Sequence, residues 1–109
     1  RILAVLRAMY DSIEDPLTLD ELATSAGISR RQIERQFRQL LNEAPAQTYR
    51  NIRLERARTL LTETNLSVME VAMASGFNSN NVFSRHYKER YGETPYGHRG
   101  RLKTLSSNE

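Results

Sequence analysis

The sequence contains no cysteine and no tryptophan among its 109 residues. Without cysteine, disulfide bonds and thiolate metal sites are excluded, and a cytosolic protein is the ordinary setting for such a chain. The two histidines, His86 and His98, lack the spacing of metal ligands to each other or to an acidic cluster. We therefore expect no metal and no cofactor.

Long apolar segments and catalytic motifs are also missing. No run approaches the roughly 20 residues that span a bilayer, and no signal-peptide pattern opens the chain. There is no nucleophile elbow, no glycine-rich phosphate loop and no paired carboxylate. We expect neither a membrane partner nor an enzyme. The chain starts inside an apolar periodic segment without an initiator Met, which indicates a fragment of a longer protein.

The charge is modest in total but unevenly placed. The net charge is +3, yet two basic and five acidic residues give residues 1–29 a net −3, while residues 30–109 carry a net +6. Fourteen of the sixteen basic residues are arginine, whose planar fork matches phosphate oxygens and the guanine edge. This pattern favours a nucleic-acid partner, although a solvated basic surface would give the same composition.

An internal repeat is the most informative feature of the chain. The pattern Leu22-Ala23-x3-Gly27-x-Ser29-x3-Ile33-x-Arg35-x-Phe37 returns about 50 residues later as Val71-Ala72-x3-Gly76-x2-Ser79-x3-Phe83-x-Arg85-x-Tyr87. Each copy has an alanine-bearing amphipathic helix, a glycine, a polar cap and a second amphipathic helix with a polar, basic outer face. This order is typical of a helix-turn-helix, which makes duplex DNA the leading ligand.

The spacing of apolar residues and caps predicts an all-α chain of about seven helices. Apolar periodicity predicts a packing helix over residues 1–13, and the capping boxes Thr18–Glu21 and Ser67–Glu70 predict helices that stop at Gly27 and Gly76. Ser29 caps the first outer helix, and Asn78 or Ser79 caps the second. A long connecting helix is expected over about 46–62 and a short final helix over 94–102, with 106–109 frayed.

The buried faces of the two outer helices follow from the same periodicity. We expect the inward residues to be Ile33, Phe37, Leu40 and Leu41 in the first and Val82, Phe83, Tyr87 and Tyr91 in the second. Phe77 is expected to be a buried aromatic at the second turn. Arg53, Arg56 and Arg58 in the connecting helix are expected to be solvated or paired with acids.

Two segments carry a family resemblance: LTLDELATSAGISRRQIERQFRQLLNEAPAQTYRNIRLERARTLL and SVMEVAMASGFNSNNVFSRHYKERYGETP. Together they resemble the two halves of an AraC/XylS-type DNA-binding domain, over about residues 17–99. The resemblance implies two helix-turn-helix subdomains, joined by the long helix, whose outer helices enter adjacent major grooves of one duplex. It assigns residues 1–45 to the first subdomain, 46–63 to the linker helix and 64–102 to the second, with a flexible tail over 103–109.

The resemblance also implies a function and partners. The protein is expected to be a transcription regulator, usually an activator, in the bacterial cytosol, with RNA polymerase and a missing N-terminal sensor or dimerisation domain as partners. The sequence from Pro16 to Phe37 is most similar to that of members with an amidotransferase-like sensor. We expect the isolated domain to be monomeric. A DNA-repair methyl-transfer protein can contain such a domain, but its transfer step needs a reactive cysteine.

The family's base-facing positions in the first outer helix fall on Arg31, Glu34 and Arg35, with Arg30 and Gln32 near the DNA backbone. Arg35 is expected to donate two hydrogen bonds to guanine, and Glu34 to accept one from cytosine N4. The alternative for Glu34 is a surface ion pair with Arg38, four residues on, of little energetic consequence.

In the second outer helix the corresponding positions are Asn80, Asn81, Ser84 and Arg85. Either asparagine can pair with adenine, and the alternative is a solvated cap and first turn. These side chains are weaker base readers than those of the first helix, so we expect looser specificity there. The expected phosphate contacts are the amides that begin the two outer helices, with Ser79, Thr48, Arg50 and Arg99.

Two glycines depart from the family pattern. Gly97 and Gly100 stand where the family keeps helix formers, so we expect the last helix to be short or mobile.

Two other functions are alternatives to sequence-specific DNA binding. A protein–protein interaction module would explain the acidic first 29 residues as a partner surface and would tolerate substitution of Arg31 and Arg35. A non-specific nucleic-acid binder is the second alternative, since charge alone binds DNA.

Overall fold

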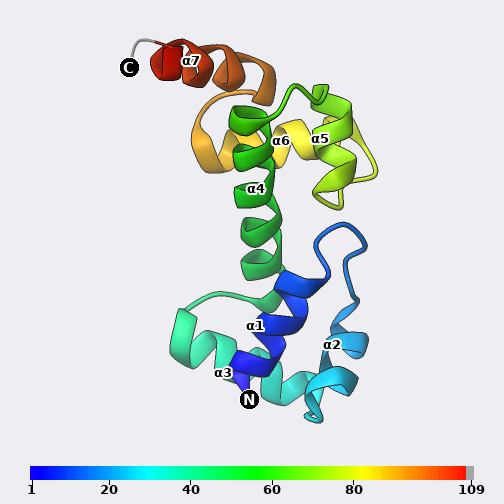
Figure 1. Ribbon diagram of the computed structural model, residues 1–109. Helices are drawn as coiled ribbons and strands as arrows, with labels where there is room; N and C mark the ends of the chain where they lie inside the picture. The colour runs from blue at the N-terminus through cyan, green and yellow to red at the C-terminus, as the bar shows by residue number, and fades with distance from the viewer. Residues whose placement is uncertain (108–109) are drawn as a thin grey trace. The chain divides into compact units, whose positions relative to one another are not determined.

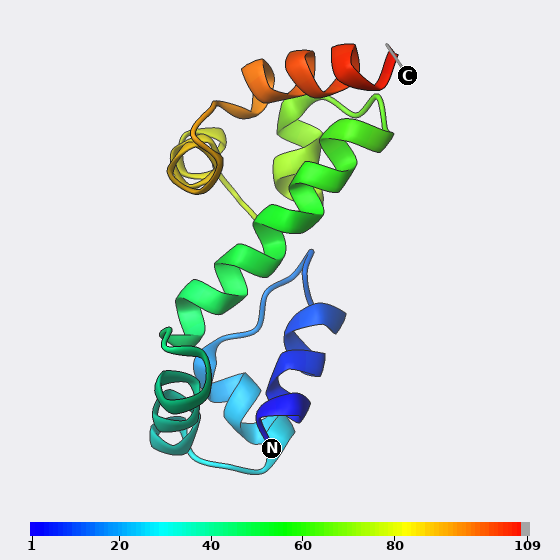
Figure 2. The ribbon, with the colours of Figure 1, turned by 90° about the vertical axis from the view of Figure 1, so that its left-hand side faces the viewer.

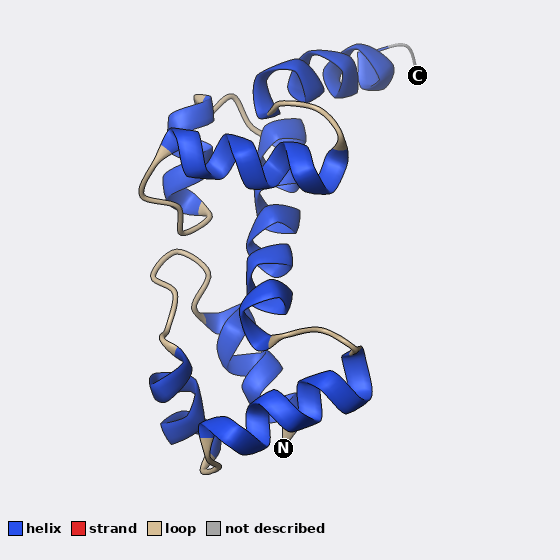
Figure 3. Ribbon diagram, turned by 180° about the vertical axis from the view of Figure 1, so that it is seen from behind, coloured by secondary structure: helices blue, strands red, loops and turns tan. Residues whose placement is uncertain are grey.

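The computed structural model describes residues 1–107, which form seven α-helices and no β-strand (Figure 1, Figure 3). This confirms the all-α prediction. In chain order the helices are α1 (Ile2–Asp11), α2 (Leu19–Ala26), α3 (Arg30–Leu41), α4 (Pro45–Glu63), α5 (Val68–Ala74), α6 (Asn80–Tyr91) and α7 (Pro95–Ser107).

The chain divides into two compact units, Arg1–Ile52 and Arg53–Glu109. The division falls inside α4, which Figure 2 shows as one unbroken helix, so α4 supplies residues to the core of each unit. Each unit therefore contains a complete helix-turn-helix pair: α2 and α3 in the first, α5 and α6 in the second.

The first unit has a mainly aliphatic core. Its buried members come from α1, α2, α3 and the first part of α4, and α1 packs on both α2 and α3. Tyr49 ties the α1–α2 loop to α4, because its hydroxyl donates to the Ser12 carbonyl and accepts from the Leu17 N–H at 3.0 Å. The largest fully buried side chains of this core are Met9, Leu22, Ile33 and Phe37.

The second unit has a core rich in aromatic rings. Phe77, Phe83 and Tyr87 pack in sequence, with centroid separations of 5.2 and 5.7 Å. Their apolar partners are Leu54, Ala57 and Leu61 of α4 with Val71 and Ala72 of α5. The predicted burial of Phe77 is confirmed, since it is only 4% exposed. Such ring pairs add about 0.5–1.5 kcal/mol each beyond the area they bury.

Local hydrogen bonds fix the starts of the four helices of the two helix-turn-helix pairs. The capping boxes predicted at Thr18–Glu21 and Ser67–Glu70 both form, and Ser29 caps α3 with a reciprocal bond from Gln32. Ser79, rather than Asn78, caps α6. Gly27 ends α2 at φ +68°, the left-handed conformation that favours glycine.

Three predicted core residues of the outer helices are exposed instead. Leu40 is 65% exposed and Leu41 39%. Val82 is 38% exposed. It lies about 100° around the helix from Phe83, away from the buried line that Phe83 and Tyr87 define. Tyr91 is partly buried and packs against the second core.

The prediction for the C-terminal segment was wrong as far as residue 107. The expected helix end near Leu102 and tail over 103–109 do not occur there, because α7 continues to Ser107. The Lys103 ammonium donates to the Thr64 carbonyl at 3.0 Å and to the Asn65 side chain at 2.9 Å. These bonds hold the second half of α7, so neither Gly97 nor Gly100 shortens it. The rest of the predicted frayed tail, 108–109, lies outside the described residues.

Candidate nucleic-acid interface

The outward face of α3 is set by its capped start and its buried side. Ser29 accepts a hydrogen bond from the Gln32 N–H at 3.1 Å, which fixes where the helix begins. Ile33 and Phe37, both fully buried, fix its rotation about the axis. The side chains this rotation turns to solvent are Arg31, Glu34, Arg35 and Arg38.

Three of these groups have no internal partner. Within residues 1–107, Arg31, Glu34 and Arg35 make no side-chain hydrogen bond and no ion pair. The alternative Glu34–Arg38 ion pair does not form. Because these polar groups make no such contact within the described residues, they can bind an external ligand without breaking one.

The residues that flank this face are partly engaged. Arg30 lies 3.5 Å from Asp20 in an exposed ion pair of small energetic consequence. The Gln32 side-chain oxygen accepts from the Ser29 N–H at 2.9 Å, which leaves its amide hydrogens as donors. Both residues keep donors toward solvent at the start of α3, where the helix dipole favours anions.

The outward face of α6 has the same architecture but different chemistry. Ser79 accepts from the Val82 N–H at 3.3 Å, and the buried Phe83 and Tyr87 fix the rotation. Asn80, Asn81 and Arg85 are exposed, while Ser84 is half-buried. No side-chain hydrogen bond or ion pair of these four occurs in the described part of the chain. This face thus offers two amides, a hydroxyl and one cation, where α3 offers three charged groups at Arg31, Glu34 and Arg35.

The structure separates the other predicted phosphate contacts. Thr48 is 8% exposed, its hydroxyl donates to Glu43 at 2.9 Å and its N–H donates to the Ala44 carbonyl at 3.1 Å. Thr48 therefore has no donor left for a phosphate, and the structure does not support that assignment. Arg99 donates from Nε to the Leu61 carbonyl at 3.2 Å, and its buried Nη2 has no hydrogen-bond partner. Arg50 is half-buried.

A polar cluster that the sequence did not reveal joins α6 to α7. The Tyr87 hydroxyl and His98 Nδ1 are 2.7 Å apart in the buried interior. Glu93 lies 3.7 Å from His98 Nε2 and accepts from Arg101 at 2.6 Å. The two histidines were considered as metal ligands only, and a tyrosine eleven residues before a histidine carries no recognisable signal of such a pair.

Burial controls the protonation of this cluster. It lowers the pKa of His98, which the neighbouring Glu93 carboxylate partly opposes. Burial also raises the pKa of the Tyr87 hydroxyl. Since Tyr87 keeps its proton and His98 is neutral at pH 7, the tyrosine hydroxyl donates to Nδ1 and the histidine hydrogen lies on Nε2, toward Glu93. The hydrogen bonds from Arg101 in turn lower the pKa of Glu93. The cluster therefore fastens α7 to α6.

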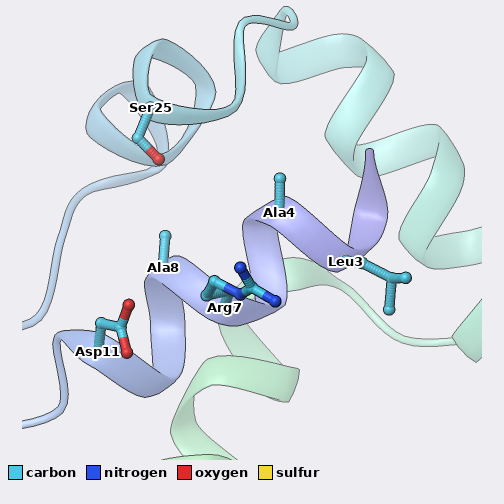
Figure 4. A pocket seen from close by; sticks show the side chains of 6 residues that line it. All are labelled: Leu3, Ala4, Arg7, Ala8, Asp11 and Ser25. Atoms are coloured by element: carbon cyan, nitrogen blue, oxygen red, sulfur yellow. The ribbon is translucent and has the colours of Figure 1, made fainter.

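A shallow groove of about 470 Å³ lies between α1 and α2 (Figure 4). Its lining contains one cation and one carboxylate, Arg7 and Asp11, on the same helix. None of the lining residues belongs to α3 or α6: they are Leu3, Ala4, Arg7, Ala8, Asp11 and Ser25. The groove therefore adds nothing to the outward faces of those helices.

Two searches of the described residues bear on other functions. No group of three or more His, Asp or Glu side chains in them is placed to hold a metal ion. None of their helices combines the length and the apolar character that crossing a bilayer requires.

Comparisons with known proteins agree with this geometry. The model of the family described as "Helix-turn-helix domain" matches residues 22–101. The HTH-type transcriptional regulator ArgR of Pseudomonas aeruginosa is 42% identical over 101 residues, which are 93% of this chain and 31% of that protein. The chain thus spans less than a third of that relative.

Two solved structures share the fold. A transcriptional regulator of Chromobacterium violaceum, described as having an AraC-type DNA-binding domain, superimposes with a TM-score of 0.89 at 38% identity, over 93% of this chain and 90% of that one. The DNA-binding domain of AdpA, solved with a target DNA, gives a TM-score of 0.91 at 28% identity, over 99% and 97% of the two chains. This chain therefore belongs to the AraC/XylS-type helix-turn-helix family, as a DNA-binding domain of a transcription regulator.

Proposed function

We propose that the two outer helices, α3 and α6, each contact a short block of base pairs in one DNA target. Membership of the family makes the chain a sequence-specific binder of double-stranded DNA. What supports the assignment of these two helices is the observation that their outward polar groups lack internal partners while caps and buried aromatics fix both helices in place. The base contacts would come from Arg31, Glu34 and Arg35 in α3 and from Asn80, Asn81, Ser84 and Arg85 in α6.

The chemistry of each side chain suggests its base. Arg35 suits guanine, because its fork can donate to both O6 and N7. Glu34 suits cytosine, whose N4 amino group donates to a carboxylate. Asn80 or Asn81 suits adenine, which offers one donor and one acceptor. A good bidentate pair is worth about 1–3 kcal/mol of discrimination, so α3 would define its block more strictly than α6.

Phosphate contacts would fix the register of the domain on DNA. The N–H groups at the starts of α3 and α6 are oriented donors, and Arg30, Gln32 and Ser79 lie beside them. Arg50 is the remaining candidate on α4. Arg99 would need to give up its hydrogen bond to the Leu61 carbonyl to bind a phosphate with Nε, so it is the weakest of the set.

The proposed setting is a bacterial regulator in the cytosol. The ArgR relative is about three times longer than the stretch it shares with this chain, which supports a further domain in cis. That this domain is a sensor or dimerisation domain of the amidotransferase-like kind rests on the family resemblance. The activator role and RNA polymerase as a further partner rest on the family alone. The isolated domain is proposed to be a monomer.

Selection of binding sites from a random duplex pool tests this proposal. The selection is run at two salt concentrations with the wild-type domain, Arg35→Ala and Asn81→Ala. Arg56→Ala is the matched control, because Arg56 is exposed on α4 and has no hydrogen-bond or ion-pair partner among residues 1–107.

The expected outcome is a motif with two short blocks. Arg35→Ala should weaken base preference in one block and Asn81→Ala in the other. Each lost base contact should cost about 1–3 kcal/mol of binding free energy, while Arg56→Ala should leave the motif unchanged. If no motif is enriched and all variants lose affinity only in proportion to charge, the chain is a non-specific electrostatic binder. If the wild type binds no duplex at either salt concentration, the interaction-module alternative stands.

A further inference from the structure

Arg53, in α4, contacts the turn between α5 and α6. Its Nη1 donates a hydrogen bond of 2.7 Å to the Gly76 carbonyl oxygen, and its guanidinium carbon lies 4.3 Å from the centroid of the Phe77 ring. All three residues belong to the second unit. A charge-assisted hydrogen bond and a cation–π contact therefore hold the turn from one side chain.

The turn is connected to the interior side of α6. Gly76 has φ +85°, so the chain reverses direction there in a conformation that favours glycine. The next residue, Phe77, is buried, and its ring lies 5.2 Å from the ring of Phe83 in α6. A continuous series of contacts thus leads from Arg53 through Phe77 to the helix that carries Asn80 and Asn81.

The first unit contains a weaker version of this contact. Arg1, at the start of α1, donates to the carbonyl of the equivalent turn glycine, Gly27, at 3.2 Å in an exposed position. Isoleucine follows Gly27, so no aromatic ring is available there for stacking. In both units an arginine from the preceding helix binds the carbonyl of the turn glycine, but in the second unit the contact is shorter and partly buried.

We propose that Arg53 is a positioning residue for base recognition by the second unit. By fixing the α5–α6 turn it sets the direction in which α6 presents its asparagines, without touching DNA itself. Side chains that contact bases need to be held within about 0.5 Å of their productive positions. The amides of Asn80 and Asn81 are short and carry no charge, so they depend on that placement more than the long arginines of α3 do. This inference rests on the proposed function.

The test measures base discrimination separately in the two blocks. Affinity for the selected duplex and for single base-pair variants of each block is determined for the wild type, Arg53→Met, Arg53→Lys and the exposed control Arg56→Met. Thermal melting of each protein reports folding, and the dependence of affinity on salt reports phosphate contacts. The methionine keeps the apolar stem, and the lysine keeps one donor but not the planar stacking group.

We expect Arg53→Met to lower discrimination in the α6 block about fivefold to tenfold, the scale of one ordinary intramolecular hydrogen bond. Discrimination in the α3 block and the salt dependence should stay as in the wild type, and Arg53→Lys should fall in between. A folded Arg53→Met with wild-type discrimination, an equal loss in both blocks or a shallower salt dependence would overturn the inference.

Two further outcomes concern a variant that does not fold and a wild type that selects no motif. If Arg53→Met does not fold, Arg53→Lys decides: a loss confined to the α6 block supports the inference, and either no loss or an equal loss in both blocks contradicts it. If the wild type selects no motif at all, the proposed function fails rather than the role of Arg53.

Discussion

The two units use the same helix-turn-helix arrangement to present different side chains to solvent. In the first, the outward face of α3 carries Arg31, Glu34 and Arg35, all charged and without partners among residues 1–107. In the second, α6 presents asparagines at its start and Arg85 one turn later. Both helices are capped by serine and held by two buried residues, so the frame is constant and the ligand-facing residues vary. From this difference we expect specificity to be concentrated in the first unit and adjusted by the second.

The cores of the two units also differ in composition. Aliphatic side chains surround Phe37 in the first unit, whereas the second joins Phe77, Phe83 and Tyr87 to a buried histidine. The first core contains one titratable side chain, Tyr49, whereas the second pairs a tyrosine with a histidine, the side chain whose unperturbed pKa lies closest to neutrality. The second unit should therefore respond to pH and to loss of aromatic packing in ways that the first does not.

Removing one core ring should produce the largest effect. Phe37→Ala and Phe83→Ala delete fully buried rings from the first and second core, and each should cost about 3–5 kcal/mol of stability. Amide exchange resolved by residue measures which unit opens. We expect exchange to accelerate mainly in the unit that carries the substitution. Equal acceleration in both units would show that the two cores unfold together.

Substitution of the repeat-equivalent arginines should produce the next largest effect. Arg35→Ala should weaken binding to the selected duplex about 10- to 100-fold, the scale of a lost guanine contact. Arg85→Ala should weaken it less, because α6 contributes less to specificity. Titrations by fluorescence anisotropy at fixed salt provide the comparison. A greater loss for Arg85→Ala would reverse the ranking of the two units.

The two serine caps should differ by a smaller amount. Ser29 takes part in a reciprocal box with Gln32, whereas Ser79 accepts one bond of 3.3 Å. Ser29→Ala should cost about 1 kcal/mol and Ser79→Ala less than that. Chemical denaturation measures both values. If Ser79→Ala proves the more damaging, Ser79 holds α6 by contacts beyond its cap.

Acidification should produce the smallest effect, and it should be confined to the second unit. The folded pKa of His98 lies below the usual value of about 6.5, so the unfolded chain binds the proton more readily. The stability contributed by neutral His98 is present above that value and is lost as the pH falls below it. The lowered pKa of Glu93 acts in the same direction at more acidic pH.

The melting temperature should therefore fall between pH 7.5 and pH 5.5. His98→Gln, which removes the titrating group, should flatten that dependence. The matched control is His86→Gln in α6, where the partly buried imidazole lies 3.5 Å from Glu89. An unchanged pH dependence in His98→Gln would place the titrating group elsewhere.

Local signals explain why much of the fold was predictable. Thr18 and Ser29 cap the starts of α2 and α3, and Gly27 ends α2. These signals lie next to the helix ends in the sequence, so they could be identified without the structure. The long α4 followed from its periodicity and proline start. By contrast, Leu40 and Leu41 follow the helical period correctly but are exposed, because burial requires a covering element that local sequence does not specify.

The candidate site was predictable only where it depends on the repeat. The outward residues of α3 and α6 followed from periodicity and family resemblance, and the structure leaves their groups facing solvent. The contacts of Arg53 and His98 were not predictable. The bond of Arg53 depends on how α4 packs on the α5–α6 turn, and the Tyr87–His98 pair joins two helices across a turn. The bond from Thr48 to Glu43, five residues earlier, is local. The extra turns of α7 depend on Lys103 reaching the start of the α4–α5 loop.

We expect α3 to specify its block of DNA more strictly than α6. The most direct test measures the affinity of the wild-type domain for the selected duplex with every single base-pair substitution in both blocks, at one salt concentration. We expect penalties of about 1–3 kcal/mol per substitution in the block that Arg35→Ala blurs, and smaller penalties in the block that Asn81→Ala blurs. Equal penalties in the two blocks, or larger ones in the α6 block, would contradict the account.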